Sequence, residues 1–260
     1  YREFVMHVTE EEKKNARRSD AYAKLQEMIG LTQAKKVIDG AINYFKLQKE
    51  YRNRGIEFNR PAMHMCFTGR PGTAKTTVAR LVAEILKDNG ILSEGKLVEV
   101  DRSQLVGKFV GHTAPQVKEM FDKAKGSVLF IDEAYTLAKE GNDFGQEAID
   151  TLLKEMEDHR DNLVVIVAGY TDRMKKFIGS NPGLESRFNR FLHFDDYTLD
   201  EMVAIFKMRC DSNKYVLGEG AEEAVRTLIQ QENENAVSFG NARGVRNLFE
   251  DVLVRQAGRL

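Results

Sequence analysis

The sequence predicts an α/β fold: a five-stranded parallel sheet sandwiched by helices, followed by a small C-terminal helical domain. Five apolar runs rich in β-forming residues alternate with helical patterns, which is typical of a mainly parallel sheet covered on both faces. After Tyr197 no further run of this kind occurs, and the remaining segments have helical periodicity only. The predicted strands are Met63–Thr68, Leu97–Val100, Ser127–Ile131, Leu163–Ala168 and Phe191–Phe194.

This change of pattern predicts three parts in the chain. Residues 1–20 form a charged linker or edge helix with possible Glu10/Lys14 pairing, and residues 21–197 form a large αβα domain. Residues 198–260 form a small helical domain. Its predicted helices are Leu199–Arg209, Ala221–Gln231 and Arg243–Arg259.

Composition restricts the classes of partner. The chain is 42% hydrophobic and 30% charged, and no segment approaches the roughly 18 uninterrupted apolar residues of a membrane span. Its 39 Lys and Arg balance 40 Asp and Glu, so no net charge attracts nucleic acid or anionic lipid. The two cysteines, Cys66 and Cys210, lack metal-ligand spacing and indicate reduced thiols in a cytoplasmic protein.

The segment after the first predicted strand matches a phosphate-binding P-loop. Gly69, Lys75 and Thr76 fit the pattern Gly-x-x-x-x-Gly-Lys-Ser/Thr, in which backbone N–H groups and a helix N-terminus bind phosphates. Ala74 replaces the second glycine. We expect a right-handed backbone at this helix start, where a methyl group is tolerated. The alternative is a glycine-rich turn beside an exposed lysine.

Two carboxylates follow the third predicted strand. Asp132 and Glu133 end the run "SVLFIDEA", which places them at the carboxyl edge of the sheet, where open α/β folds bind ligands. One carboxylate can hold magnesium through water, and the other can polarise the water that attacks a γ-phosphate. A helix N-cap is the alternative for this pair taken alone. Together with the P-loop, the pair predicts an ATPase.

Four motifs in this order and spacing resemble the AAA+ ATPases, a superfamily of P-loop NTPases with a helical lid. They are "GRPGTAKTT", "LFIDEA", "NPGLESRF" and "GNARGVRN", and the resemblance runs from about Leu25 to the C-terminus. Longer phrases such as "LVGKFVGHTAPQVKEMF" resemble the group that contains the red-type Rubisco activase, sporulation stage V protein K and the type VII secretion ATPase. Within that group, the nearest resemblance is to stage V protein K.

The resemblance implies a complete nucleotide site for ATP and Mg²⁺. Magnesium would be held by Thr76 and Asp132, and Glu133 would activate the attacking water. The adenine would lie against Ile29 and Gly30 of "MIGL", for which packing at a helix start is the alternative. The implied phosphate-binding residues are Pro71, Gly72, Thr73, Ala74, Lys75, Thr76 and Thr77.

The resemblance also implies two sensor residues. Thr171, at the end of the fourth predicted strand, matches sensor 1, which orients the attacking water, and Tyr170 is its alternative by one position. Arg243 in "GNAR" matches sensor 2, a lid residue that reaches the γ-phosphate. Arg246, one turn along, is the alternative.

Arg187 in "ESRF" matches the arginine finger, which stabilises the charge developing on a neighbouring subunit's phosphoryl group. Arg190 is the alternative finger, and a surface salt bridge is the alternative role for Arg187. A finger acting between subunits implies a homo-oligomeric ring, by resemblance a hexamer.

A loop after the second predicted strand, "VGKFVGHT", lies where AAA+ proteins have a pore loop. Lys108, Phe109 and Val110 lie between two glycines and could grip an extended peptide without reading its sequence. The alternative is that Phe109 packs into the core, as most phenylalanines do.

These features favour an ATP-driven ring that threads or remodels a protein client. The second hypothesis is a nucleic-acid motor, which the balanced charge and the aromatic pore tip oppose. The third is a degenerate nucleotide-binding module, which Ala74 allows and which the intact Lys75, Asp132, Glu133 and Arg187 oppose.

Overall fold

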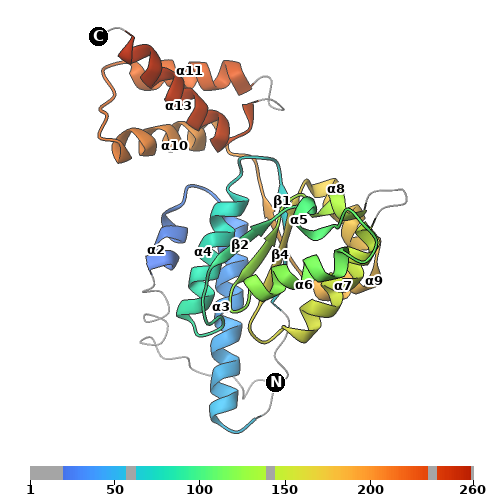
Figure 1. Cartoon of the computed structure of the whole chain (residues 1–260). Helices are drawn as coiled ribbons and strands as arrows, with labels where there is room; N and C mark the ends of the chain where they lie inside the picture. The colour runs from blue at the N-terminus through green and yellow to red at the C-terminus, as the bar shows by residue number, and fades with distance from the viewer. Residues whose placement is uncertain (1–19, 57–62, 139–143, 234–238, 259–260) are drawn as a thin grey trace.

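The computed structural model describes residues 20–56, 63–138, 144–233 and 239–258. At its centre is a five-stranded, wholly parallel sheet with the strand order β2-β3-β4-β1-β5 (Figure 1). The strands are β1 (Met65–Gly69), β2 (Leu97–Val100), β3 (Val128–Ile131), β4 (Val164–Gly169) and β5 (Arg190–Phe194). Each coincides with a predicted strand to within two residues, so the predicted parallel α/β fold is confirmed.

Helices cover both faces of the sheet because successive strand residues on both faces are apolar. Phe67 and Ile166 pack against helices on one face, whereas Cys66 and Val165 pack against helices on the other. The first face is covered by α2 (Asp20–Glu27), α3 (Thr32–Asn53) and α4 (Lys75–Asp88). The second is covered by α5 (Arg102–Leu105), α6 (Thr113–Lys123), η1 (Ala134–Ala138), α7 (Gly145–Asp158), α8 (Thr171–Gly179) and α9 (Pro182–Arg187).

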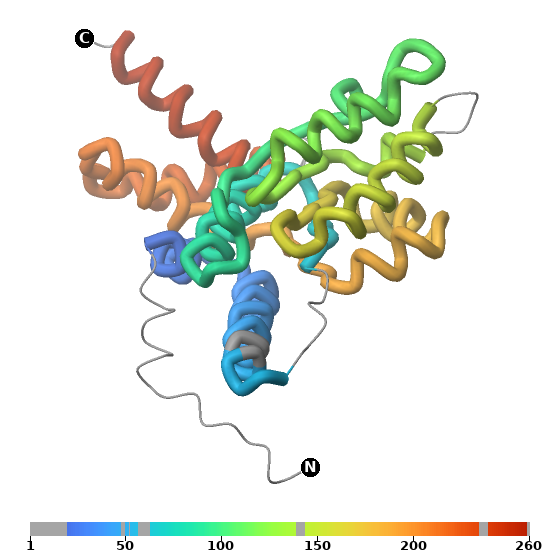
Figure 2. Tube along the Cα trace, turned by 60° about the horizontal axis from the view of Figure 1, so that its bottom comes forward, coloured from blue at the N-terminus to red at the C-terminus, as the bar shows by residue number. Residues whose placement is uncertain are grey.

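A lid of helices follows the last strand. It contains α10 (Leu199–Ser212), α11 (Ala221–Asn233) and α13 (Ala242–Ala257), which lie to one side of the sheet domain (Figure 2). The lid has a core of its own, in which Phe206, Ile229 and Phe249 are almost fully buried. Thr198 and Glu201 form a reciprocal capping box that fixes where α10 begins. The predicted C-terminal helical lid is therefore confirmed.

The sheet register brings three loops together at one edge. Thr68 of β1 pairs with Gly169 of β4, and Ile131 of β3 pairs with Val167 of β4. Strands β1, β3 and β4 therefore end at nearly the same level. The loops that follow them, together with the start of the lid, form the site described below.

The structure also bears on the predictions about membrane spans and the two cysteines. Within the described residues, the structure has no helix that is both long and apolar enough to cross a bilayer. Cys66 and Cys210 are buried without a disulfide partner, and burial raises the pKa of the Cys66 thiol to about 12. The predicted Glu10/Lys14 pairing lies outside the described residues.

Candidate functional site

A cavity of about 420 Å³ lies at the carboxyl edge of the sheet. Four parts of the chain line it: the P-loop with the start of α4, the Asp132–Glu133 pair, the end of β4, and the lid helices. The cavity thus brings together the two motifs that the sequence placed far apart along the chain.

The P-loop, residues 69–74, folds as a tight strand-to-helix turn. Gly72 has a φ of +77°, and Thr73 is buried with its hydroxyl donating to the Arg70 carbonyl at 2.8 Å. No side chain caps the N-terminus of α4, so its first N–H groups need partners from elsewhere. A 14-residue helix whose open N-terminus faces a cavity provides the arrangement that binds phosphate.

The expectation of a right-handed backbone at Ala74 is wrong. Ala74 has φ 69° and ψ 18°, which is left-handed and is the conformation that the usual glycine adopts without strain. The loop must turn sharply to direct its N–H groups into the cavity, and this turn determines the conformation whatever the side chain. The methyl group therefore strains the backbone, although Ala74 still lines the cavity.

The Ala74→Gly variant is expected to be more stable than the natural chain. Removing a left-handed alanine relieves strain that exceeds the entropy added to the unfolded chain, so the free energy of unfolding should rise by about 1 kcal/mol. Urea unfolding followed by circular dichroism measures this change. Ala79→Gly, in the right-handed interior of α4, is the matched control and should be destabilising. Equal destabilisation by both changes would contradict the strained backbone.

Lys75 extends back along its own loop. Its Nζ donates to the carbonyl oxygens of Gly69 at 2.8 Å and Arg70 at 2.7 Å. Burial lowers the pKa of Lys75, and the charge of Arg243 adds to this, while Asp132 opposes it. An anion in the cavity would favour the charged amine and give it a stronger acceptor than a carbonyl.

The acidic pair lies opposite the P-loop. Asp132 and Glu133 both line the cavity and are both exposed, and Asp132 accepts a hydrogen bond from the Glu133 N–H at 2.9 Å. Glu133 has a positive φ of 47°, so its backbone is in a strained conformation. The hydroxyl of Thr76 and the carboxylate of Asp132 are oxygen donors of the kind magnesium prefers, so the lining fits that ion.

Arg173 links the acidic loop to the end of β4. Its guanidinium carbon lies 5.1 Å from the centre of the Tyr135 ring and 5.2 Å from that of Tyr170, and Nη1 donates to the Tyr135 hydroxyl at 3.2 Å. Burial raises the pKa of Tyr135, and the charge of Glu133 adds to the rise.

Tyr170 and Thr171 follow the last residue of β4, and they differ in where they lie. Tyr170 lines the cavity, whereas Thr171 is the first residue of α8 and does not line it. Of these two residues, the cavity lining therefore includes Tyr170, the alternative, and not Thr171.

The lid contributes a group of arginines. Arg209 of α10 and Arg243 and Arg246 of α13 all line the cavity. Arg246 pairs with Glu250 at 3.7 Å, whereas the Nε atom of Arg209 is buried without a hydrogen-bond partner. With Lys75 these arginines supply four positive charges against two carboxylates, which gives the lining a net charge of +2. Such a lining suits a polyphosphate anion.

Other predicted site residues lie outside this cavity. Thr73 stabilises the loop through its hydrogen bond to the Arg70 carbonyl. Ile29 and Gly30 lie against the lid. A Cβ on Gly30 would meet the Glu201 carboxylate and the Tyr197 ring. Arg187 is half-buried on the second face of the sheet. Its guanidinium lies 3.8 Å from the Glu157 carboxylate and donates to the Gly183 carbonyl at 3.4 Å.

The predicted pore loop is exposed between α5 and α6. Phe109 is 67% exposed and Val110 is 84% exposed, so the alternative that Phe109 packs into the core is wrong. Phe109 makes an edge contact with the His112 ring, at 5.5 Å between centroids. Thr113 fixes the base of the loop by accepting a hydrogen bond from the Gly107 N–H at 3.1 Å.

Comparison with known proteins identifies the family. The pattern of the family described as "ATPase family associated with various cellular activities (AAA)" matches residues 65–196. The chain belongs to the AAA ATPases. The pattern described as "AAA lid domain" matches residues 198–260, and members of the AAA family hydrolyse ATP, which they typically bind with Mg²⁺.

Several curated proteins resemble this AAA ATPase over 90% of its length. It is 45% identical to the "Protein CfxQ homolog" of Trieres chinensis and covers 81% of that relative. It is 43% identical to the "Ribulose bisphosphate carboxylase/oxygenase activase, chloroplastic" of Cyanidioschyzon merolae and covers 80% of it. Its identity to the "Stage V sporulation protein K" of Bacillus subtilis is 39%, with 73% of that relative covered.

The chain therefore belongs to the group of AAA ATPases that contains these three proteins. The identities do not single out stage V sporulation protein K, the nearest resemblance suggested by the motifs. Among solved structures, a point mutant of RuvB from Thermotoga maritima has a TM-score of 0.58 and 21% identity. The likeness covers 87% of this chain and 63% of that one, and it shows the fold alone.

Sequence reasoning missed three features of the site. Arg209 lies in a helix with no motif around it, so nothing in the sequence distinguishes it from a surface arginine. Arg173 and Tyr135 meet only because η1 and α8 are packed together. Asn241 stood within a recognised motif, yet no pattern in the sequence showed that its side chain is buried.

Proposed function

We propose that the chain is the motor subunit of a homo-oligomeric ring, by resemblance a hexamer, which uses ATP hydrolysis to remodel a protein client in the cytoplasm. The observation that supports this best is that two candidate sites lie on different parts of the molecule. A cationic cavity for a nucleotide lies between the sheet domain and the lid, and an exposed aromatic loop lies apart from it.

The site residues act on the phosphates of ATP in distinct ways. The N–H groups at the start of α4 and the Lys75 ammonium bind the phosphate oxygens, and Arg243 of the lid binds the terminal phosphate. Thr76 and Asp132 would hold magnesium, which would neutralise charge on the phosphates. Glu133 orients the attacking water and accepts its proton, and Tyr170 lines the same cavity.

Arg187 would complete the site of a neighbouring subunit. Its guanidinium lies outside the cavity of its own chain, and its buried Nε has no hydrogen-bond partner, so its charge is only partly satisfied by Glu157. A guanidinium beside the transferring phosphoryl group stabilises the negative charge that develops there. In this proposal hydrolysis requires assembly of the ring.

A protein client is favoured over a nucleic acid. The tip of the exposed loop presents Phe109 and Val110 with a single cation, Lys108, which suits apolar contact with an extended peptide more than neutralisation of phosphates. One relative is named as an activase of ribulose bisphosphate carboxylase/oxygenase, which supports a protein as the target.

A trap experiment tests the nature of the client. Glu133→Gln protein loaded with ATP is recovered from lysate of the source organism, and its bound material is compared with that of Lys75→Ala protein. The glutamine variant should bind ATP without hydrolysing it and retain one specific protein that the lysine variant does not. Enrichment of nucleic acid instead would favour the motor of the second hypothesis.

Phe109→Ala, introduced into the Glu133→Gln protein, is expected to abolish retention of that client. The loop lies outside the nucleotide cavity, so the Kd for a fluorescent ATP analogue should not change and serves as the control for folding. Phe191→Ala is the matched control, since Phe191 is also exposed, at 52%, but lies on β5. Client retention by the Phe109→Ala protein equal to that of the control would contradict the pore-loop assignment.

A further inference from the structure

A buried asparagine joins the lid to the P-loop. Asn241 precedes α13 and is only 8% exposed. Its backbone has φ 56° and ψ −134°, a conformation that costs a non-glycine residue about 1–3 kcal/mol and persists only where the surroundings enforce it. Its side chain does not cap α13 and is directed instead at other segments.

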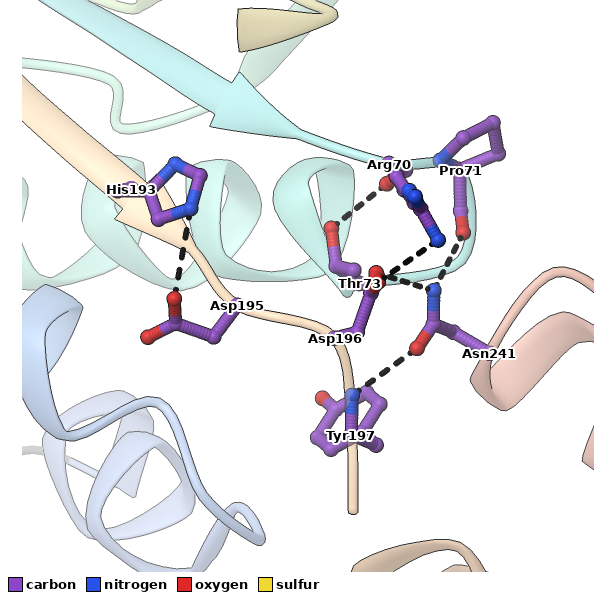
Figure 3. A network of polar contacts seen from close by, with 8 residues as sticks. All are labelled: Arg70, Pro71, Thr73, His193, Asp195, Asp196, Tyr197 and Asn241. Carbon is purple, nitrogen blue, oxygen red and sulfur yellow. Dashed lines mark hydrogen bonds and ion pairs between the residues drawn. The ribbon is translucent and has the colours of Figure 1, made fainter. Parts of the chain in front are cut away.

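The side-chain amide of Asn241 bonds to three residues outside the lid helices (Figure 3). Its oxygen accepts from the Tyr197 N–H at 2.9 Å. Its nitrogen donates to the Asp196 carboxylate at 2.9 Å and to the Pro71 carbonyl at 3.4 Å. Pro71 belongs to the P-loop, and Asp196 and Tyr197 belong to the segment that connects β5 to α10.

These contacts need an amide in particular. A carboxylate at position 241 would lose both donated bonds and face the carboxylate of Asp196, which already pairs with Arg70 at 3.1 Å. An alanine would leave the buried Tyr197 N–H without its acceptor. Because removing one partner of a buried hydrogen bond leaves the other unsatisfied, either change should weaken the junction.

The backbones at this junction are in direct contact. The Ala242 N–H donates to the Gly72 carbonyl at 3.2 Å, and a Cβ on Gly72 would clash with the Gly240 carbonyl oxygen. Arg243 follows immediately, and it lines the same cavity as Lys75. The P-loop is therefore bonded directly to the segment that carries the lid arginine.

We infer that Asn241 is a positioning residue for ATP hydrolysis, which fixes the lid on the P-loop so that Arg243 is held over the phosphate site. The inference rests on the proposed function and deepens it. Asn241 itself does not line the cavity, so it acts through Arg243. The strained backbone directs the amide at the segment between β5 and α10 and the next residues toward the P-loop.

Asn241→Asp is the test variant, with Asn247→Asp as the matched control. Asn247 is exposed on the same helix, and the structure records no side-chain bond for it, so the control makes the same change of charge. The kcat of the Asn241→Asp protein should fall by about 10- to 100-fold, the effect of misplacing a group by about 1 Å. Its preference for ATP over ADP, measured as a ratio of Kd values, should fall as well.

A double-mutant cycle separates positioning from general support of the fold. If Asn241 acts through Arg243, Asn241→Asp should cause little further loss in an Arg243→Ala background. Fully additive losses, or kcat equal to that of the Asn247→Asp control, would overturn the inference.

An exchange variant keeps the inference testable should Asn241→Asp unfold. Combining it with Asp196→Asn restores the bond between positions 241 and 196 with donor and acceptor reversed, and should recover part of the lost turnover. Failure of the folded exchange variant to exceed an Asn241→Ala protein in turnover would count against the inference. Absence of turnover in the natural chain would contradict the proposed function instead. In that case the double-mutant cycle of Asn241→Asp and Arg243→Ala, measured on the Kd for ATP, would decide the role of Asn241.

Discussion

The Glu133→Gln protein is expected to bind ATP with unchanged affinity and to hydrolyse it about 10²- to 10⁴-fold more slowly than the natural chain, the range for loss of a general base. Glutamine keeps the shape of Glu133 and can still contact water, but it cannot accept a proton. Phosphate release under saturating ATP measures kcat, and titration with a fluorescent ATP analogue measures Kd.

The control for this change is Glu84→Gln, because Glu84 is exposed on α4 and does not line the cavity. It should leave both constants unchanged. A Glu133→Gln protein that turns over ATP as fast as the control would show that another group activates the water. Tyr135, two residues along the chain from Glu133, would then be the first residue to examine.

The Arg187→Ala protein is expected to lose about 10³- to 10⁵-fold in kcat, the range measured for arginine fingers. Arg160→Ala is the matched control, because Arg160 pairs with the same Glu157 carboxylate, at 2.8 Å, and is more exposed. The Kd for ATP should change much less than kcat, since the residue lies outside the cavity of its own chain.

Mixing two inactive proteins tests whether Arg187 acts between subunits. A Glu133→Gln subunit still carries Arg187, and an Arg187→Ala subunit still has an intact cavity. In a mixed ring the first can complete the site of the second, so activity should reappear on mixing. A mixture that stays inactive despite co-assembly, while Arg160→Ala remains active, would favour a salt bridge within the chain as the role of Arg187.

The fold and the residues at the carboxyl edge of the sheet could be predicted because both depend on sequence patterns that tertiary contacts do not override. The five strands are short apolar runs, and burial of both faces of the sheet requires such runs. Lys75 follows the first run after the P-loop, and Asp132 and Glu133 follow the third run directly, so their meeting at one edge follows from the parallel arrangement. The prediction of an exposed Phe109 needed the resemblance, since most phenylalanines are buried.

The features of the site that the sequence did not predict depend on backbone conformation and on contacts between distant segments. The left-handed backbone of Ala74 is imposed by the turn of the whole loop, against the preference of alanine. The choice between Tyr170 and Thr171 depends on where β4 stops, which sequence patterns fix only to within a few residues. Arg209 and Asn241 acquire their roles only when the lid folds onto the P-loop.

The most direct test of the account is the ATP turnover of the natural chain, per subunit, as a function of protein concentration. If the site is completed by the Arg187 of a neighbour, turnover per subunit should be very low at nanomolar protein and rise toward a plateau as rings assemble, in step with the mass measured by light scattering. Full turnover per subunit from monomers at nanomolar concentration would contradict an ATPase that works only as a ring.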